Sequence, residues 1–354
     1  MRRVNIDSVR NDAKLARTIF NSEGGVLLTK GVTINESYIY RLREYGINEI
    51  YIDDLMSSGI TVTDVVEDKT RKDSEVLVKK TMLNYSFSDS LDVEAVKRTV
   101  NKIIDELLSN RDIIYNLAEI RKVDDYTFEH SVNVCILSLI TGIGLGFNID
   151  RLRELGTGAL LHDIGKLFIP KSILLKPTHL TVDEFETIKK HTVLGYDALK
   201  NSGKVNLTTA YIAFGHHERY DGSGYPLQLK SDNIQIYARI VAVADVYDAL
   251  TSDRVYRKRL KPCEVYEYIT SLSINHFDPK VIDSFVKYVT VYPVGTGVML
   301  NTKERALVVR NNRHTPTRPV IRIVNDEYFK KVKSFKEIDL SEQSSIFIVD
   351  SCEI

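Results

Sequence analysis

Two polar stretches limit the folds open to this chain more than any other feature of its sequence. The first is His162-Asp163-Ile164-Gly165-Lys166, and the second runs from His216-His217-Glu218 to the turn Gly224-Tyr225-Pro226. Both adjoin apolar or glycine-rich segments, where imidazole and carboxylate groups are costly to bury unless a metal ion or a phosphate satisfies them. We therefore expect a fold that brings the two stretches together around such a ligand.

Length and composition place the chain among ordinary globular proteins. Its 354 residues exceed what one hydrophobic core usually spans, so two or three domains are expected. The formal net charge is zero, from 48 basic and 48 acidic residues, which gives no overall field that favours a nucleic acid polymer or an anionic membrane. No apolar run approaches the roughly 18 to 20 residues of a membrane span, so we expect a cytoplasmic protein. The three cysteines, Cys135, Cys263 and Cys352, are too dispersed to indicate a disulfide framework.

The amino-terminal residues 1–66 predict a small α/β module. Apolar runs at 24–28 and 47–52 are typical of strands, and the amphipathic segment 35–42 between them is typical of a helix. No catalytic constellation occurs here, so a structural or regulatory role is expected. The polar residues 67–74 that follow fit either a linker or the start of a helix.

Residues 67–289 predict an all-helical domain. Asp278-Pro279 supplies an N-cap and a first-turn proline, and Thr181 to Glu184 fits a capping box before a helix expected to run through His191. Farther upstream, five apolar residues recur at three- and four-residue steps: Val93, Val96, Val100, Ile103 and Leu107. This stripe fits packing on the rest of the helical domain, and the alternative is a seam between two copies of the chain.

The carboxyl-terminal residues 290–354 predict a small β meander. Aliphatic runs at 298–300, 306–309, 320–324 and 345–349 are separated by polar and turn-forming residues. They carry no recognisable chemistry, so a structural or partner-binding role is expected. The expected fold is therefore mainly α, with a helical domain at 67–289 flanked by the small α/β module at 1–66 and the small β module at 290–354.

The helical domain holds a set of candidate metal ligands. Five of the chain's eight histidines and two aspartates fall in apolar or glycine-rich contexts: His130, His162, Asp163, His191, His216, His217 and Asp245. One such histidine is more often a satisfied core residue, but seven candidates in one domain favour a metal site. Imidazole and carboxylate donors without cysteine suit iron, manganese, cobalt or nickel, with zinc as a further option. Because the set exceeds what one ion needs, we expect two ions about 3.5 to 4 Å apart.

Groups suited to phosphate binding accompany these ligands. Lys166 lies one helical turn from His162 and would share its face if that stretch is helical. Arg254 and Arg257 follow at an i, i+3 spacing that suits phosphate contacts, and Asp248 lies just upstream of them. For the two arginines a solvated helix face is the alternative.

The motifs resemble those of the HD-GYP family of metal-dependent phosphohydrolases. The stretch from His162 to Lys166 resembles its HD signature, and the stretch from His216 through Gly224-Tyr225-Pro226 resembles its second signature. The likeness extends over roughly residues 95 to 290. It implies an all-helical HD domain that hydrolyses cyclic di-GMP at a bi- or trinuclear metal centre.

The resemblance also implies roles for single residues. The seven imidazole and carboxylate residues above would be the metal ligands, with Asp163 bridging the ions and Lys166 contacting the scissile phosphate. The substrate would meet a further set: Lys166, Gly224, Tyr225, Pro226, Asp248, Arg254 and Arg257. Family members with a third metal carry a glutamate four residues before the first histidine. Tyr126, preceded by Asp125, stands there in this chain, so we expect two divalent ions, iron or manganese.

The expected reaction is hydrolysis of cyclic di-GMP to the linear dinucleotide or to GMP, with Asp163 and Lys166 as catalytic residues. One alternative keeps the site but takes another cyclic dinucleotide or a different phosphoester. A second alternative is a sensor that binds the nucleotide and signals through its flanking modules to a partner or a second copy. Every ligand position of a two-metal site is present, and this favours the enzyme.

Overall fold

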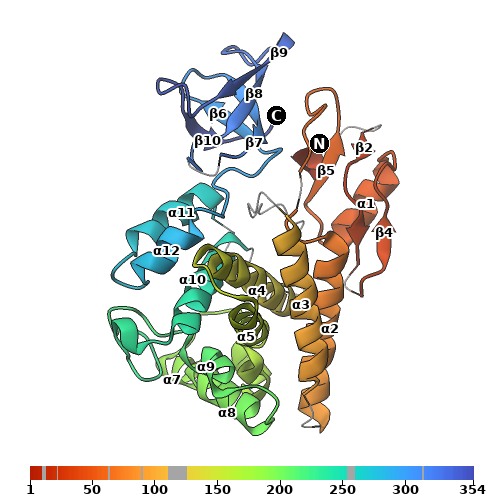
Figure 1. Cartoon of the computed structure of the whole chain (residues 1–354). Coiled ribbons are helices and arrows are strands. Elements are labelled where there is room, and N and C mark those ends of the chain that lie inside the picture. Colours follow the sequence, from red (N-terminus) through yellow and green to blue (C-terminus); the bar gives the residue numbers. More distant parts are fainter. Residues whose placement is uncertain are drawn as a thin grey trace. The chain divides into compact units, whose positions relative to one another are not determined.

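The chain forms two compact units in a computed structural model that describes residues 1–9, 13–21, 23–62, 64–88, 91–110, 126–252, 260–312 and 315–354. One unit contains Met1–Val65 and Val289–Ile354, and the other contains the described residues of Val66–Ile113 and Asp125–Tyr288. Figure 1 shows the helical unit and the smaller sheets, and the predicted mainly helical architecture with small flanking modules is confirmed. The division into three separate domains stays a prediction.

The helical unit is built on four central helices. Helix α4 (Tyr126–Gly144) packs against α5 (Ile149–Leu160), α10 (Ile236–Thr251) and the long α2 (Asp68–Ser88). The remaining helices are α3 (Val93–Ser109), α6 (Lys171–Leu174), α7 (Val182–Lys189), α8 (His191–Asn201), α9 (Leu207–Gly215), α11 (Pro262–Ser271) and α12 (Pro279–Phe285), with short 3₁₀ turns η2 (Ile164–Phe168) and η3 (Ser231–Asn233). None of the described helices combines the length and apolarity that a membrane crossing requires.

The apolar stripe of α3 is part of this unit's own core. All five of its residues, Val93, Val96, Val100, Ile103 and Leu107, are fully buried, and α3 packs against α5 and α2 of the same chain. The packing interpretation is therefore confirmed, and the stripe is not free to pair with a second copy. Of the polar residues 67–74, all from Asp68 onward belong to the start of α2, so the helix alternative is confirmed for them.

The prediction of one helix from Thr181 through His191 is wrong, because the helix is interrupted at Lys190. The predicted capping box is present, with Thr181 and Glu184 each accepting a hydrogen bond from the other's backbone N–H. Helix α7 nevertheless ends at Lys189, and α8 begins at His191. The His191 ring nitrogen Nδ1 lies 2.7 Å from the carbonyl oxygen of Ile188, which a continuous helix would use for its own backbone.

The described residues of the second unit form three antiparallel sheets. In the amino-terminal segment, β1 (Arg2–Asn5), β5 (Glu49–Asp53) and β2 (Lys14–Leu15) form one sheet and β3 (Ile19–Phe20) pairs with β4 (Val26–Leu28), beside η1 (Ile6–Ser8) and α1 (Glu36–Glu44). The carboxyl-terminal sheet has the order β10-β6-β7-β8-β9, from β6 (Gly297–Leu300), β7 (Arg305–Arg310), β8 (Val320–Asn325), β9 (Lys331–Asp339) and β10 (Ile348–Ser351). Sequence analysis did not predict β9, because its largely exposed residues contain no apolar run.

The amino-terminal and carboxyl-terminal segments share one hydrophobic core within this unit. Buried Tyr51 and Ile60 from the first segment cluster with Leu307 and Val324 from the second. The Arg322 guanidinium donates from Nη1 to the carbonyl oxygens of Ser58, at 2.6 Å, and Met56, at 3.1 Å. Two modules that are remote in sequence are thus joined by both apolar and polar contacts.

Candidate metal centre

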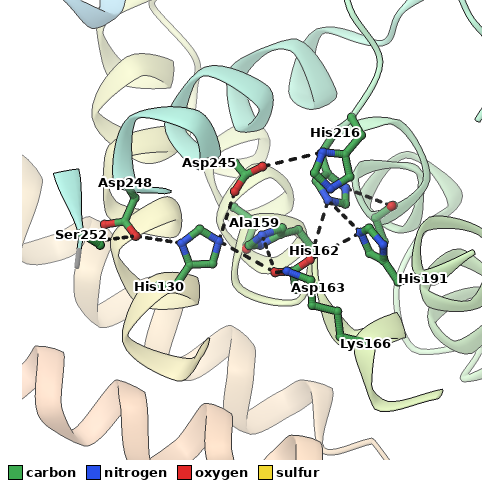
Figure 2. Close-up of polar contacts among 12 residues, drawn as sticks. His130, Ala159, His162, Asp163, Lys166, His191, His216, Asp245, Asp248 and Ser252 are labelled. Atoms are coloured by element: carbon green, nitrogen blue, oxygen red, sulfur yellow. Dashed lines mark hydrogen bonds and ion pairs between the residues drawn. The ribbon is translucent and has the colours of Figure 1, made fainter. Parts of the chain in front are cut away.

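The candidate ligands come from five parts of the helical unit and converge on one point. Figure 2 shows His130 from α4, Asp245 from α10 and His191 from the start of α8 directed toward His162 and Asp163. His162 and Asp163 occupy the turn between α5 and η2, and His216 with His217 follows α9. The two sequence stretches therefore meet in space, as their polar character predicted.

Asp163 lies at the middle of the cluster and faces four imidazoles. Its Oδ2 is 3.3 Å from His162 Nε2 and 3.8 Å from His130 Nε2. Its Oδ1 is 3.6 Å from His191 Nε2 and 3.8 Å from His216 Nε2. All five side chains are almost completely buried. A carboxylate with imidazoles on both of its oxygens can be shared between two cations.

Asp245 supplies a second carboxylate, which shares His130 with Asp163 and adds His217 to the cluster. Its Oδ1 lies 3.2 Å from His130 Nε2, and its Oδ2 lies 3.8 Å from His217 Nδ1. The seven candidate ligands thus form one connected group rather than separate clusters.

The residues present fit divalent metal ions. Their ligand atoms form three overlapping groups within 4.8 Å: His191, His216 and His217; His130, His162 and Asp245; His162, Asp163 and His216. Among the described residues, the buried atoms His162 Nε2 and Asp163 Oδ1 have no hydrogen-bond partner. Buried polar atoms without partners are unfavourable, and a cation placed between them would satisfy both. The imidazole and carboxylate donors suit first-row divalent ions.

The orientation of the rings is fixed from outside the cluster. At three histidines Nδ1 faces a backbone carbonyl oxygen: Ala159 O at 2.8 Å from His162, Ile188 O at 2.7 Å from His191, and Ala213 O at 3.0 Å from His216. A carbonyl can only accept, so Nδ1 carries the proton and Nε2 presents its lone pair to the centre. His130 differs, because its Nδ1 lies 2.8 Å from a carboxylate oxygen of Asp248.

Burial sets the charge of most imidazoles in the cluster. Removal from water disfavours the protonated ring, which lowers the pKa of His216 to about 3 and also lowers the pKa values of His191 and His217. At His130 the effect of burial is outweighed by hydrogen bonds to Asp245 and Asp248, which raise the pKa to about 9. A cation bound to Nε2 of His130 would take the place of that proton.

The two central carboxylates are ionised in spite of their burial. Burial favours the neutral acid, but Lys166 and His162 hold the pKa of Asp163 well below its ordinary value. The hydrogen bond from His130 has the same effect on the pKa of Asp245, against the opposing effect of burial. Both groups are therefore in the anionic form that binds cations.

Lys166 and the Gly224-Tyr225-Pro226 turn, both predicted to meet the substrate, adjoin the cluster. The Lys166 ammonium forms an ion pair with Asp163 and remains one-third exposed. The Tyr225 ring stacks on His217 with ring centroids 4.8 Å apart. A methyl group at Gly224 would lie 2.3 Å from the backbone nitrogen of Arg219, so this tight turn requires glycine.

The other predicted substrate residues have different surroundings. Asp248 is fully buried behind His130, where its carboxylate also lies 3.4 Å from the Ser252 hydroxyl. Arg254, Arg257 and Asp125 lie outside the described residues. Tyr126 is the first residue of α4, and the structure describes its backbone only.

Sequence analysis assigned no role to Glu218, although it braces the second motif. Its buried carboxylate accepts hydrogen bonds from the backbone N–H groups of Leu227, at 2.7 Å, and Leu229, at 3.0 Å. These contacts hold the far end of the turn that carries Tyr225. The signal in the sequence was a carboxylate placed directly after two candidate ligands.

Gly165 in the first motif allows an unusually close approach of two backbones. A Cβ atom at this position would lie 1.9 Å from the carbonyl oxygen of His191 and 2.6 Å from the nitrogen of Gly195. Only a residue without a side chain lets η2 pass this close to the start of α8. The glycine therefore positions His191 against Asp163.

Comparison with known proteins bears on this site. The model of the HD domain matches residues 123–281, and the model of a KOW domain associated with HD domains matches residues 297–354. A cyclic di-GMP phosphodiesterase of Pseudomonas aeruginosa is 31% identical over 331 residues, covering 86% of this chain and 78% of that relative. The chain belongs to the HD-GYP family. The HD domain match contains all seven candidate ligands, which accords with a cluster able to bind metal ions.

Two further comparisons agree with membership of the HD-GYP family. A cyclic di-GMP phosphodiesterase of Thermotoga maritima is 41% identical over 184 residues, which are 52% of this chain and 50% of that relative. Among solved structures, Bd1817, an HDG"Y"P protein from Bdellovibrio bacteriovorus, gives a TM-score of 0.50 at 17% identity, covering 80% of this chain and 97% of that chain. The structural likeness concerns the fold alone.

Proposed function

We propose that this chain hydrolyses the phosphodiester bonds of cyclic di-GMP, giving the linear dinucleotide or GMP. One observation carries the proposal: the buried Asp163, faced by four imidazoles, lies beside the partly exposed Lys166 ammonium. This arrangement combines candidate metal ligands with a group that can meet a phosphate. Membership of the HD-GYP family and the activity of the Pseudomonas aeruginosa relative support the same reaction.

We further propose that the site holds two divalent ions, iron or manganese. The ligands would be His130, His162, Asp163, His191, His216, His217 and Asp245, with Asp163 shared between the ions. When bound, the ions would supply Lewis-acid activation of water near neutral pH and stabilise charge on the phosphate oxygens. Tyr126, in place of the glutamate associated with a third metal, supports two ions rather than three.

The chain's own residues have separable tasks in this proposal. Asp163 holds the centre together, because each of its oxygens faces imidazoles from different helices. Lys166 donates to a non-bridging oxygen of the scissile phosphate and stabilises the charge that develops there. Tyr225 would border the bound substrate through its position beside the centre, where it stacks on His217. Asp248 orients His130 from behind, and its burial supports this positioning role over a direct substrate contact.

The experiment that tests the function combines metal analysis with product analysis. The full chain is purified without oxygen, its metal content is measured by elemental analysis, and its products from cyclic di-GMP are identified by mass spectrometry. We expect about two ions per chain and conversion to the linear dinucleotide or GMP. Asp163→Ala should lose both metal and turnover, whereas Asp197→Ala, on the exposed side of α8, should retain both.

Three results would contradict the proposal. Turnover at the wild-type rate by metal-supplemented Asp163→Ala would remove Asp163 from the mechanism. Faster turnover of another cyclic dinucleotide would contradict the assignment of cyclic di-GMP as the substrate, although the assignment of phosphodiester hydrolysis would stand. Tight binding of cyclic di-GMP by the metal-loaded protein without any product would favour a sensor.

A further inference from the structure

An aromatic and cationic cluster extends from the metal centre onto helix α7. The Phe185 ring meets the Tyr225 ring edge to face, with centroids 6.4 Å apart. The Lys189 ammonium lies 4.9 Å from the centroid of Phe185 and 5.5 Å from that of Tyr225. Tyr225 in turn stacks on His217, a candidate metal ligand. A continuous run of rings therefore leads from the centre to the surface.

The outer part of this cluster is accessible. Phe185 keeps 45% of its surface exposed, and the Lys189 side chain is 28% exposed. Lys189 also forms an ion pair with Glu186 one turn earlier, at 2.6 Å. Phe185 is exposed, has a cation over its ring and lies next to a candidate catalytic site. The packing of α7 alone does not explain this combination, which suits the binding of a ligand.

Helix α7 is held firmly enough to act as a platform. Its start is closed by the capping box of Thr181 and Glu184. The Glu184 carboxylate also accepts hydrogen bonds from Lys176, at 2.6 and 2.8 Å, which ties the preceding loop to the helix. Phe185 follows this anchored residue directly, so its ring has a defined position relative to Tyr225.

We propose that Phe185, Lys189 and Tyr225 form a subsite for a purine base of the substrate, with Lys189 selecting guanine over adenine. The inference rests on the proposed function, because a cyclic dinucleotide with one phosphate at the centre must place a base nearby. Aromatic side chains stack on bases of any sequence. Lys189 can donate to N7 and O6 of guanine, whereas adenine presents a donor at the position of O6.

Direct binding measurements on the full-length, metal-loaded protein test the subsite. Calorimetry compares three probes, GMP, AMP and inorganic phosphate, on wild type and on Phe185→Ala. Stacking predicts a rise of about tenfold or more in the Kd of both nucleotides for Phe185→Ala, with no change for inorganic phosphate. Val182→Ala, at a 78% exposed position of the same helix, is the matched control and should bind all three probes like wild type.

A second variant tests the selection of guanine. Lys189→Met keeps the length of the stem that carries the ammonium but removes the ammonium itself, so the preference for GMP over AMP should fall several-fold. With cyclic di-GMP as substrate, both variants should raise KM more than they lower kcat, and their metal content should match that of wild type.

The outcomes separate the subsite from the proposed function. If wild type neither binds nor hydrolyses cyclic di-GMP, the proposed function fails. If wild type is active but Phe185→Ala binds GMP as tightly as wild type does, the aromatic subsite is refuted and Phe185 only packs α7. If Lys189→Met weakens inorganic phosphate and GMP equally, Lys189 binds phosphate and its role in base selection is refuted.

Discussion

Replacing Gly165 by alanine should disable the metal centre although none of the candidate ligands is substituted. The added Cβ would lie 1.9 Å from the carbonyl oxygen of His191, whereas ordinary contacts begin at 3.4 Å, so the two backbones must separate by about 1.5 Å. His191 Nε2 now lies 3.6 Å from Asp163 Oδ1. A shift of that size moves the ring out of reach of a cation shared with Asp163.

The size of the effect can be worked out from this displacement. Overpacking of a tight contact costs about 1 to 3 kcal/mol, which lowers Tm by roughly 2 to 10 °C for a domain of this size. Activity should fall more, because a misplacement of about 1 Å in a catalytic group can reduce the rate roughly 100-fold. We therefore expect a folded protein with reduced metal content and at most a few per cent of wild-type turnover.

The assay is a comparison of Gly165→Ala with Gly195→Ala. Gly195 lies across the same contact, but a methyl group there would approach no atom closer than 3.2 Å, so small adjustments suffice. Metal content, thermal unfolding and hydrolysis of cyclic di-GMP are measured for both variants. Wild-type metal content and turnover in Gly165→Ala would refute the argument that this glycine sets the position of His191.

Three further predictions follow from contacts around the centre and in the sheet unit. Asp248→Asn should weaken metal retention against a chelator roughly 10- to 100-fold, because it disturbs the orientation of His130. The control is Asp197→Asn on the exposed side of α8. Equal metal retention in the two variants would contradict the role of Asp248. Glu218→Ala leaves the partly buried backbone N–H groups of Leu227 and Leu229 without their acceptor. Thermal unfolding should therefore show a loss of about 1 kcal/mol in the free energy of unfolding, with a smaller loss for Glu218→Gln. Equal losses in the two variants would contradict the role of these hydrogen bonds. Deletion of residues 297–354 would expose the hydrophobic core around Tyr51. Limited proteolysis of the shortened protein should therefore cleave the amino-terminal segment first. An unchanged digestion pattern would show that this segment folds alone.

Features set by neighbouring residues were predictable from the sequence. The capping box of Thr181 and Glu184 and the buried stripe of α3 depend on spacings of three or four residues, and both were confirmed. The convergence of the two motifs followed from the cost of leaving their polar groups unsatisfied. The metal and substrate roles of individual residues stay predictions that the proposed experiments address.

Features that depend on remote contacts were not predictable in the same way. The roles of Glu218 and Asp248 become visible only when their partners are known, and those partners come from another turn and another helix. The shared core of the two terminal segments joins Tyr51 to Leu307, which no local pattern links. The helix is interrupted before His191, where the His191 side chain competes for the carbonyl oxygen of Ile188. A capping box predicts where a helix begins but not such an interruption.

The orientation of the histidine rings has a consequence for how the centre tolerates mutation. For His162, His191 and His216 the orienting oxygen belongs to the main chain, so a change of side chain at the residue that supplies it leaves the oxygen in place. His130 alone among these four relies on a side chain, that of Asp248. A single nucleotide change can therefore remove the support of one ring but not of the other three, and variation that tunes metal affinity without loss of a ligand is expected to concentrate at Asp248.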